Sequence, residues 1–192
     1  MSWENHIKFI PACFHIVGSG NFNESILLPR EHQQRLTEWI GIMKKWKLVY
    51  KASRDGFGAK DFHKACDGKG ENLGVIKSAN GSYLFGWWTP LSWQSQGDWQ
   101  SDTSTFIFTL TNPAGVSAKY KNKDSRYAIY NNAAYGPHLG GGSDIYVPDN
   151  SNVNDGYTNF PHSYEDTTGR GNATFTGNAN FKVSELEVFV PV

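Results

Sequence analysis

The chain has 192 residues, of which 39% are hydrophobic and 15% aromatic, enough apolar material for the core of one domain and too much for a disordered chain. Lysine plus arginine and aspartate plus glutamate each number 18, so the formal net charge is zero and the basic excess typical of nucleic-acid-binding proteins is missing. The sequence contains no run of about 18 apolar residues, so no transmembrane segment is predicted.

The first residues also lack the pattern of a secretory signal peptide. With only Cys13 and Cys66, a disulfide framework is not expected. We therefore predict a cytoplasmic protein with two reduced thiols.

The residue pattern of the N-terminal half predicts two helices separated by a strand. Apolar residues between Leu36 and Met43 recur at the i, i+3, i+4, i+7 spacing, which predicts a helix over residues 29–43. Residues 46–53 alternate instead, with Leu48 and Tyr50 on one face, which predicts a strand. A short helix is predicted over residues 59–66, where Asp67-Gly68 would end it.

An Asn-Gly pair marks the clearest turn in the chain. Asn80-Gly81 lies between the segments 73–78 and 83–88, and this pair readily takes the positive φ angles of a type I′ hairpin turn. Two β-strands are therefore expected to flank it as a hairpin.

Further strands are predicted over residues 105–110, 126–131 and 185–190. We expect one core to bury Phe106, Phe108, Leu110, Leu48 and Tyr50 together. Residues 135–180 are rich in Gly, Asn, Asp and Ser, so long ordered loops with short strand pieces are expected there. Strands joined by turns, with only a few short helices, indicate an α+β fold resembling a β-sandwich.

A set of motifs in fixed order resembles the TLDc domain family. The motifs are KASRDGF (51–57), DFH (61–63), CDGKG (66–70), LGVIKS (73–78), FGW (85–87), SW (92–93), STFIFTL (104–110), YGP (135–137), GGGSD (140–144) and FKVSELEVF (181–189). Each motif alone is weak evidence, but the ordered set covers nearly the whole chain. The resemblance places a TLDc domain at residues 23–192, and we expect residues 1–22 to be an extension packed on it.

The resemblance implies a sandwich of two antiparallel sheets decorated with short helices. It also implies a eukaryotic, non-catalytic protein-interaction domain, linked to protection from oxidative stress and to binding of vacuolar-type proton ATPase subunits. No catalytic residues are agreed for the family, so none is carried over, and no cofactor is expected. Neither the oligomeric state nor the particular partner follows from the resemblance.

Aromatic residues in two regions are the candidate partner contacts. Trp87 and Trp88 are adjacent, so they point to opposite sides of a strand, and one of them is expected outside the main core. Tyr146, Tyr157 and Phe160 lie in or beside the longest loop, 140–159, where aromatic side chains could anchor a partner.

Two other functions stay open. The Trp-rich hairpin and the Asn-rich loop would suit a carbohydrate- or calcium-dependent binding module, with oxygen ligands from Asp144, Asp149, Asn150 and Asn152. Cys66 could instead serve a thiol enzyme, which requires an exposed, stabilised thiolate. His63 and Cys66 lie three residues apart, but a zinc site usually needs three or four protein ligands, so we expect a structural, buried Cys66.

Overall fold

Two antiparallel sheets of six strands each form the body of the protein in the computed structural model, which describes residues 21–192. The first sheet has the order β1-β12-β2-β3-β5-β6, and the second has the order β11-β10-β9-β8-β7-β4. The strands are β1 (Trp46–Lys51), β2 (Asn72–Ser78), β3 (Leu84–Thr89), β4 (Asp98–Gln100), β5 (Phe106–Thr111), β6 (Ala118–Lys121), β7 (Ile129–Asn131), β8 (His138–Leu139), β9 (Ile145–Tyr146), β10 (Gly156–Tyr157), β11 (Asn180–Phe181) and β12 (Val183–Pro191). The helices are α1 (Arg30–Ile40), α2 (Ala52–Asp55) and α3 (Ala59–Cys66), with 3-10 helices η1 (Ser125–Tyr127) and η2 (Gly171–Ala173). The predicted sandwich with short helices is confirmed.

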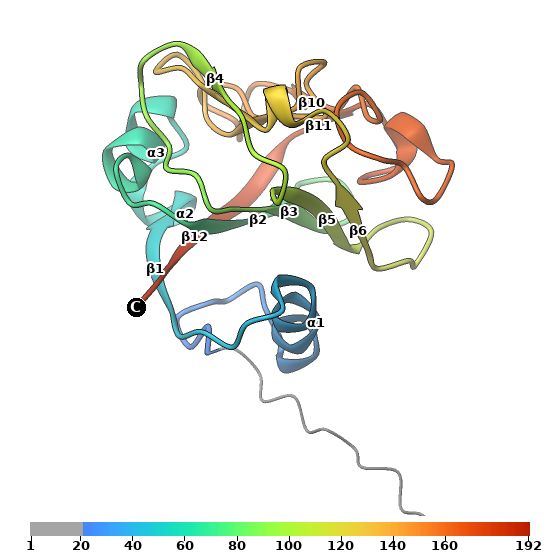
Figure 1. Ribbon diagram of the computed structural model, residues 1–192, viewed down its shortest axis with the longest axis horizontal. Coiled ribbons are helices and arrows are strands. Elements are labelled where there is room, and N and C mark those ends of the chain that lie inside the picture. The colour runs from blue at the N-terminus through green and yellow to red at the C-terminus, as the bar shows by residue number, and fades with distance from the viewer. Residues whose placement is uncertain (1–20) are drawn as a thin grey trace, which may run out of the picture.

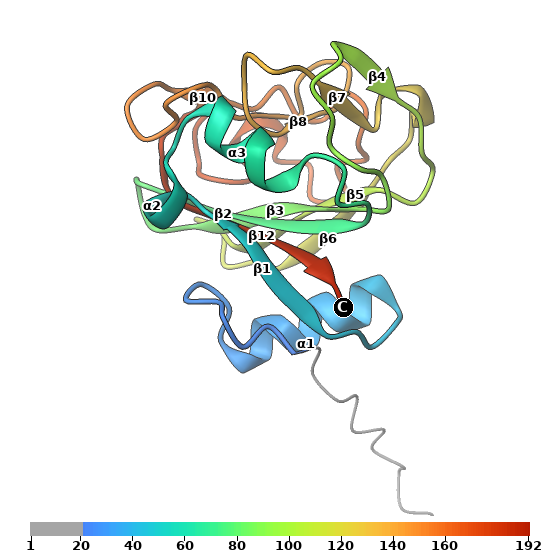
Figure 2. The ribbon, with the colours of Figure 1, turned by 90° about the vertical axis from the view of Figure 1, so that its left-hand side faces the viewer.

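The first sheet lies between helix α1 and the second sheet (Figure 1). One hydrophobic core, which includes Phe85, Trp87 and Phe181, fills the space between the two sheets. A second core joins α1 to the opposite face of the first sheet and includes Leu36 and Phe108. Helices α2 and α3 lie beside one edge of the sandwich, next to β1 (Figure 2). The first sheet is thus covered on both faces, whereas no helix or further sheet from residues 21–192 covers the outer face of the second.

A β-bulge in β1 divides the predicted core residues between these two cores. Leu48 pairs with Phe189 and Tyr50 pairs with Val188, so one extra residue of β1 stands between consecutive pairs. Leu48 therefore packs under α1, in the same core as Phe106, Phe108 and Leu110. Tyr50 turns to the core between the sheets. The prediction of one shared core was wrong for Tyr50, because a bulge breaks the period of two on which it relied.

Most predicted elements appear with shifted ends. Helix α3 has the predicted bounds, whereas α1 ends at Ile40 because Gly41 takes a left-handed conformation with φ of 80°. The strand predicted over 46–53 ends at Lys51, where α2 begins. The strand predicted over 126–131 begins as η1 and becomes β7 only at Ile129.

The hairpin of β2 and β3 forms, but its turn differs from the prediction. Positive φ angles occur at Gly81 (75°) and Ser82 (54°), one residue later than the predicted Asn-Gly pair. The Ser78 side chain explains the wider loop: its hydroxyl donates to the Asn80 carbonyl at 2.6 Å and accepts from the Tyr83 N–H at 3.1 Å. A local side-chain bond has therefore replaced the two-residue turn.

Residues 1–20 lie outside the described part of the chain, so the predicted packing of residues 1–22 on the domain stays a prediction. Cys13 also falls there. Within the described end of that segment, Phe22 stacks on Trp46, with ring centroids 5.4 Å apart. Over residues 21–192, none of the helices combines the length and apolar character needed to cross a membrane.

Candidate functional site

An unbroken row of rings crosses five adjacent strands of the second sheet. The row consists of Tyr157 on β10, Tyr146 on β9, His138 on β8, Tyr130 on β7 and Trp99 on β4. Successive ring centroids are 4.9, 5.4, 5.5 and 4.7 Å apart in that order. We call these five residues the aromatic ladder. Contacts of this kind between neighbouring strands stabilise a sheet, and they also hold the rings in fixed positions.

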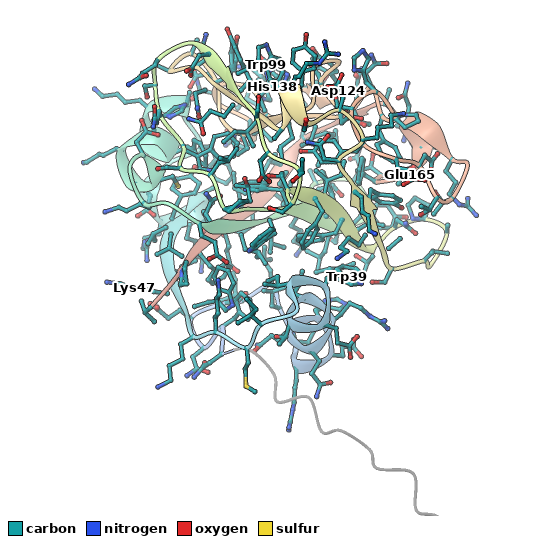
Figure 3. The ribbon with its side chains drawn as sticks, in the orientation of Figure 1. Trp39, Lys47, Trp99, Asp124, His138 and Glu165 are labelled. Atoms are coloured by element: carbon teal, nitrogen blue, oxygen red, sulfur yellow. The ribbon has the colours of Figure 1, made fainter. Side chains whose placement is uncertain are left out.

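The ladder points away from the hydrophobic core because side chains alternate along each strand. Ile129, Leu139 and Ile145, the sequence neighbours of three ladder residues, are buried in the core between the sheets. The ladder residue beside each of them on the strand, Tyr130, His138 or Tyr146, must therefore face outward. Figure 3 shows Trp99 and His138 on the side of the second sheet that lies away from the first.

Most of the ladder is half-buried rather than fully exposed. Tyr157 is the most exposed member, at 39% of its surface, and His138 is the most buried, at 9%. Tyr135 flanks the ladder, with its ring centroid 5.2 Å from that of Tyr146 and 5.9 Å from that of His138. The outer face of the second sheet thus presents rigid aromatic surface with limited freedom to reorganise.

Helix α3 anchors the segment that carries Tyr135. His63 is buried, with Nδ1 2.7 Å from an Asp67 carboxylate oxygen and Nε2 2.9 and 3.0 Å from the carbonyl oxygens of Asn132 and Tyr135. A histidine engaged in this way ties α3 to the loop between β7 and β8, and it is not directed toward the Cys66 thiol as a metal ligand.

A hydrogen-bonded chain of side chains supports the ladder. The Tyr157 hydroxyl donates to the Ser143 Oγ at 3.1 Å, and that oxygen lies 2.9 Å from Nε2 of His138. Burial lowers the pKa of His138 to about 4, and its Nδ1 has no hydrogen-bond partner among the described residues. His138 is therefore neutral near pH 7, and the ladder carries no formal charge.

The low pKa of His138 predicts a loss of stability in mild acid. The unfolded chain binds a proton below pH about 6.5, whereas the folded protein takes it up only near pH 4. The contribution of neutral His138 to the free energy of unfolding should therefore be fully present above pH about 6.5. It should fall by about 3 kcal/mol when the pH is lowered to about 4. Urea unfolding at several pH values measures this.

His138→Phe is the matched control, because it keeps an aromatic ring and removes the titrating group. Burial lowers the pKa of His32 as well, so part of the acid loss should remain in the variant. If wild type and His138→Phe lost the same stability between pH about 7 and about 4, His138 would not be the group responsible.

The structure separates the predicted partner contacts into three groups. Tyr146 and Tyr157 belong to the aromatic ladder. Trp87 and Phe160 are 0% and 1% exposed in the core between the sheets, so neither lies at the surface. Trp88 is half-buried beside the core under α1, where it stacks on Phe106 and donates to Glu71 Oε1 at 2.9 Å. The two adjacent tryptophans do point to opposite sides, as predicted.

Sequence reasoning did not connect Trp99, Tyr130, Tyr135 and His138 with Tyr146 and Tyr157. A weak signal was present, since an aliphatic residue stands beside an aromatic or histidine side chain at 129–130, 138–139 and 145–146. Strands of two or three residues are too short for such a pattern to be recognised as periodic. Only their pairing in one sheet brings the rings together.

The four candidate calcium ligands have separate structural roles or lie exposed. The buried Asp144 carboxylate accepts the N–H groups of His162 and Ser163 at 2.6 and 2.8 Å, while burial raises its pKa. Asp149 accepts the N–H of Ala59 at 2.8 Å, at the start of α3. Asn150 and Asn152 are exposed. Within residues 21–192, no group of three or more His, Cys, Asp or Glu side chains is placed to hold a metal ion.

Cys66 is buried and free in α3, as expected for a structural cysteine. Burial raises the pKa of its thiol well above the ordinary value, and nearby Asp67 acts in the same direction. A reactive thiol needs the opposite shift together with exposure. The geometry therefore opposes the thiol-enzyme hypothesis.

The model of the TLDc domain matches residues 21–191, which is almost the whole described chain. No match was found among curated proteins.

Proposed function

Because the chain belongs to the TLDc domain family, we propose that it is a non-catalytic protein-interaction domain that binds its partner through the aromatic ladder. The observation that carries the proposal is the unbroken row of outward-facing rings from Trp99 to Tyr157. Tyrosine and tryptophan are enriched in protein interfaces, because they combine a large apolar surface with a polar group. Rings already held in place also lose little conformational entropy on binding.

The family resemblance supports the finer part of the proposal. We place the domain in the cytoplasm of a eukaryotic cell, in protection from oxidative stress and in regulation of the vacuolar-type proton ATPase. Subunits of that ATPase are the proposed partners. A pull-down from eukaryotic cell extract with the purified chain tests this, since recovery of the subunits would support the proposal and their reproducible absence would oppose it.

Tyr146→Ala and Tyr157→Ala should weaken partner capture while lowering the melting temperature only modestly, since each cross-strand ring contact that is lost contributes about 0.2–1 kcal/mol to stability. Both side chains lie at the surface of the ladder, and loss of an aromatic interface anchor costs about 2 kcal/mol of binding, or roughly a 30-fold weaker affinity. Differential scanning fluorimetry and quantitative pull-down measure the two effects. Val153→Ala, at an apolar residue exposed in a neighbouring loop, should change neither.

A different outcome would move the interface. If both tyrosine variants melted at much lower temperature while the remaining folded protein bound normally, these tyrosines would act only in stability. Trp88 would then be the first residue to test.

A further inference from the structure

Two hollows meet at Met43, in the loop between α1 and β1. The first has a volume of about 320 Å³ and is lined by Thr37, Glu38, Gly41, Ile42 and Met43. The second, of about 420 Å³, is lined by Met43, Lys44, Lys45 and Asn21. We call the two hollows together the α1 groove. Helix α1 and the sheet that carries the aromatic ladder lie on opposite sides of the first sheet, so the groove is a separate surface (Figure 1).

The α1 groove presents apolar side chains to solvent. Ile42 and Met43 expose 60% and 63% of their surface. Single hydrophobic residues at a surface are ordinary, whereas two adjacent ones beside a hollow indicate a binding surface. The charged groups of the groove have partners already, since Glu38 lies 3.7 Å from Arg35 and Lys44 is paired with Glu71. The groove therefore suits an apolar segment.

The described part of the chain begins at one end of this groove. Asn21 forms a parallel bridge with Lys45. The Asn21 N–H donates to the Lys44 carbonyl at 3.3 Å, and the Trp46 N–H donates to the Asn21 carbonyl at 2.9 Å. Because both segments of a parallel pair run in the same direction, the bridge directs the chain that precedes Asn21 back toward Met43.

We infer that residues 9–17 of this chain occupy the α1 groove. In this segment, FIPACFHIV, only His15 is polar. Residues 18–20, Gly-Ser-Gly, can span about 10 Å with little side-chain bulk, which is enough to bring Val17 beside Met43. A segment tethered at the groove also binds it at a high effective concentration. The inference concerns another surface than the ladder and does not rest on the proposed function.

The test measures how fast a thiol reagent labels a cysteine placed in the groove of the full chain. Met43→Cys is combined with Cys13→Ser, so that these two positions form no disulfide, and Cys66 is buried. Asn23→Cys in the same background is the matched control, because Asn23 is exposed near Asn21 but does not line the groove. We expect labelling at position 43 to be at least about tenfold slower than at position 23.

Two further changes show whether the segment is what covers position 43. Phe14→Ser removes a large apolar side chain from the segment, so it should speed labelling at position 43 by at least about fivefold. Asn5→Ser lies outside residues 9–17 and should leave the rate unchanged. The melting temperature of each variant shows that the domain is still folded.

Three results would overturn the inference. Equal labelling at positions 43 and 23 would mean that the groove is open. Slow labelling that Phe14→Ser does not alter would mean that another group covers Met43. Protection that disappears when the protein is diluted about 100-fold would assign the groove to a second copy of the chain. Protection that is independent of concentration and lost in Phe14→Ser supports the inference.

Discussion

Replacing Asn72 by leucine is expected to lower the free energy of unfolding by about 4 kcal/mol, since two buried indole N–H groups and two half-buried carbonyl oxygens would each lose a hydrogen bond worth about 1–3 kcal/mol. Its Oδ1 accepts the indole N–H groups of both Trp87 and Trp93, at 2.8 and 2.9 Å. Its Nδ2 donates to the carbonyl oxygens of Gly70 and Leu91, at 2.9 and 2.8 Å. Asn72 is only 2% exposed, so water does not replace these bonds. Urea unfolding measures the loss.

Asn152→Leu is the matched control, because the same change at an exposed loop position should alter stability by no more than about 0.5 kcal/mol. A double-mutant cycle with Trp93→Phe tests the mechanism. If the indole bond contributes as the geometry indicates, Asn72→Leu will cost less in the Trp93→Phe background. Strictly additive effects would show that the asparagine acts in another way.

Gly86→Ala should lower the free energy of unfolding by at least about 4 kcal/mol or prevent folding, an effect reserved for severe strain or overpacking. Gly86 lies in the middle of β3, and a Cβ atom there would lie 1.9 Å from the Gly74 carbonyl oxygen. That oxygen belongs to the backbone of β2, so relief would require the two central strands to separate. Soluble expression and urea unfolding check the prediction.

Gly136→Ala provides the comparison, because Gly136 is also buried but a Cβ there would meet Val147 at an ordinary 3.4 Å. We expect a change below about 1 kcal/mol at this position, since no overpacking arises. Similar losses for both variants would mean that the close strand approach at Gly86 does not decide stability.

Elements encoded by short-range signals could be predicted from the sequence. Helix α3 has the predicted bounds, because its apolar spacing and its end at Asp67 are local properties. Gly68, which the sequence places just beyond the end of this helix, has a positive φ angle of 71°. The family resemblance rests on the same local motifs and therefore also came from the sequence, and the match over residues 21–191 bears it out.

The candidate site could be predicted only in part. Tyr146 and Tyr157 were identified as exposed aromatic residues of a long loop, without their neighbours in space. Phe160 came from the same loop but is buried, because a segment rich in Gly and Asn does not reveal which of its aromatic residues turn inward. The distinction depends on the sheet that covers each side chain.

By itself, the sequence determined the family, the sandwich of antiparallel strands, the short helices and the buried Cys66. The tertiary structure alone decided that Trp99, Tyr130, His138, Tyr146 and Tyr157 form one surface, and that Leu48 and Tyr50 lie in different cores. The physical reason is the same in both cases. Helix periods and turn residues act over a few residues, whereas strand register and bulges are settled by pairing between segments far apart in the chain.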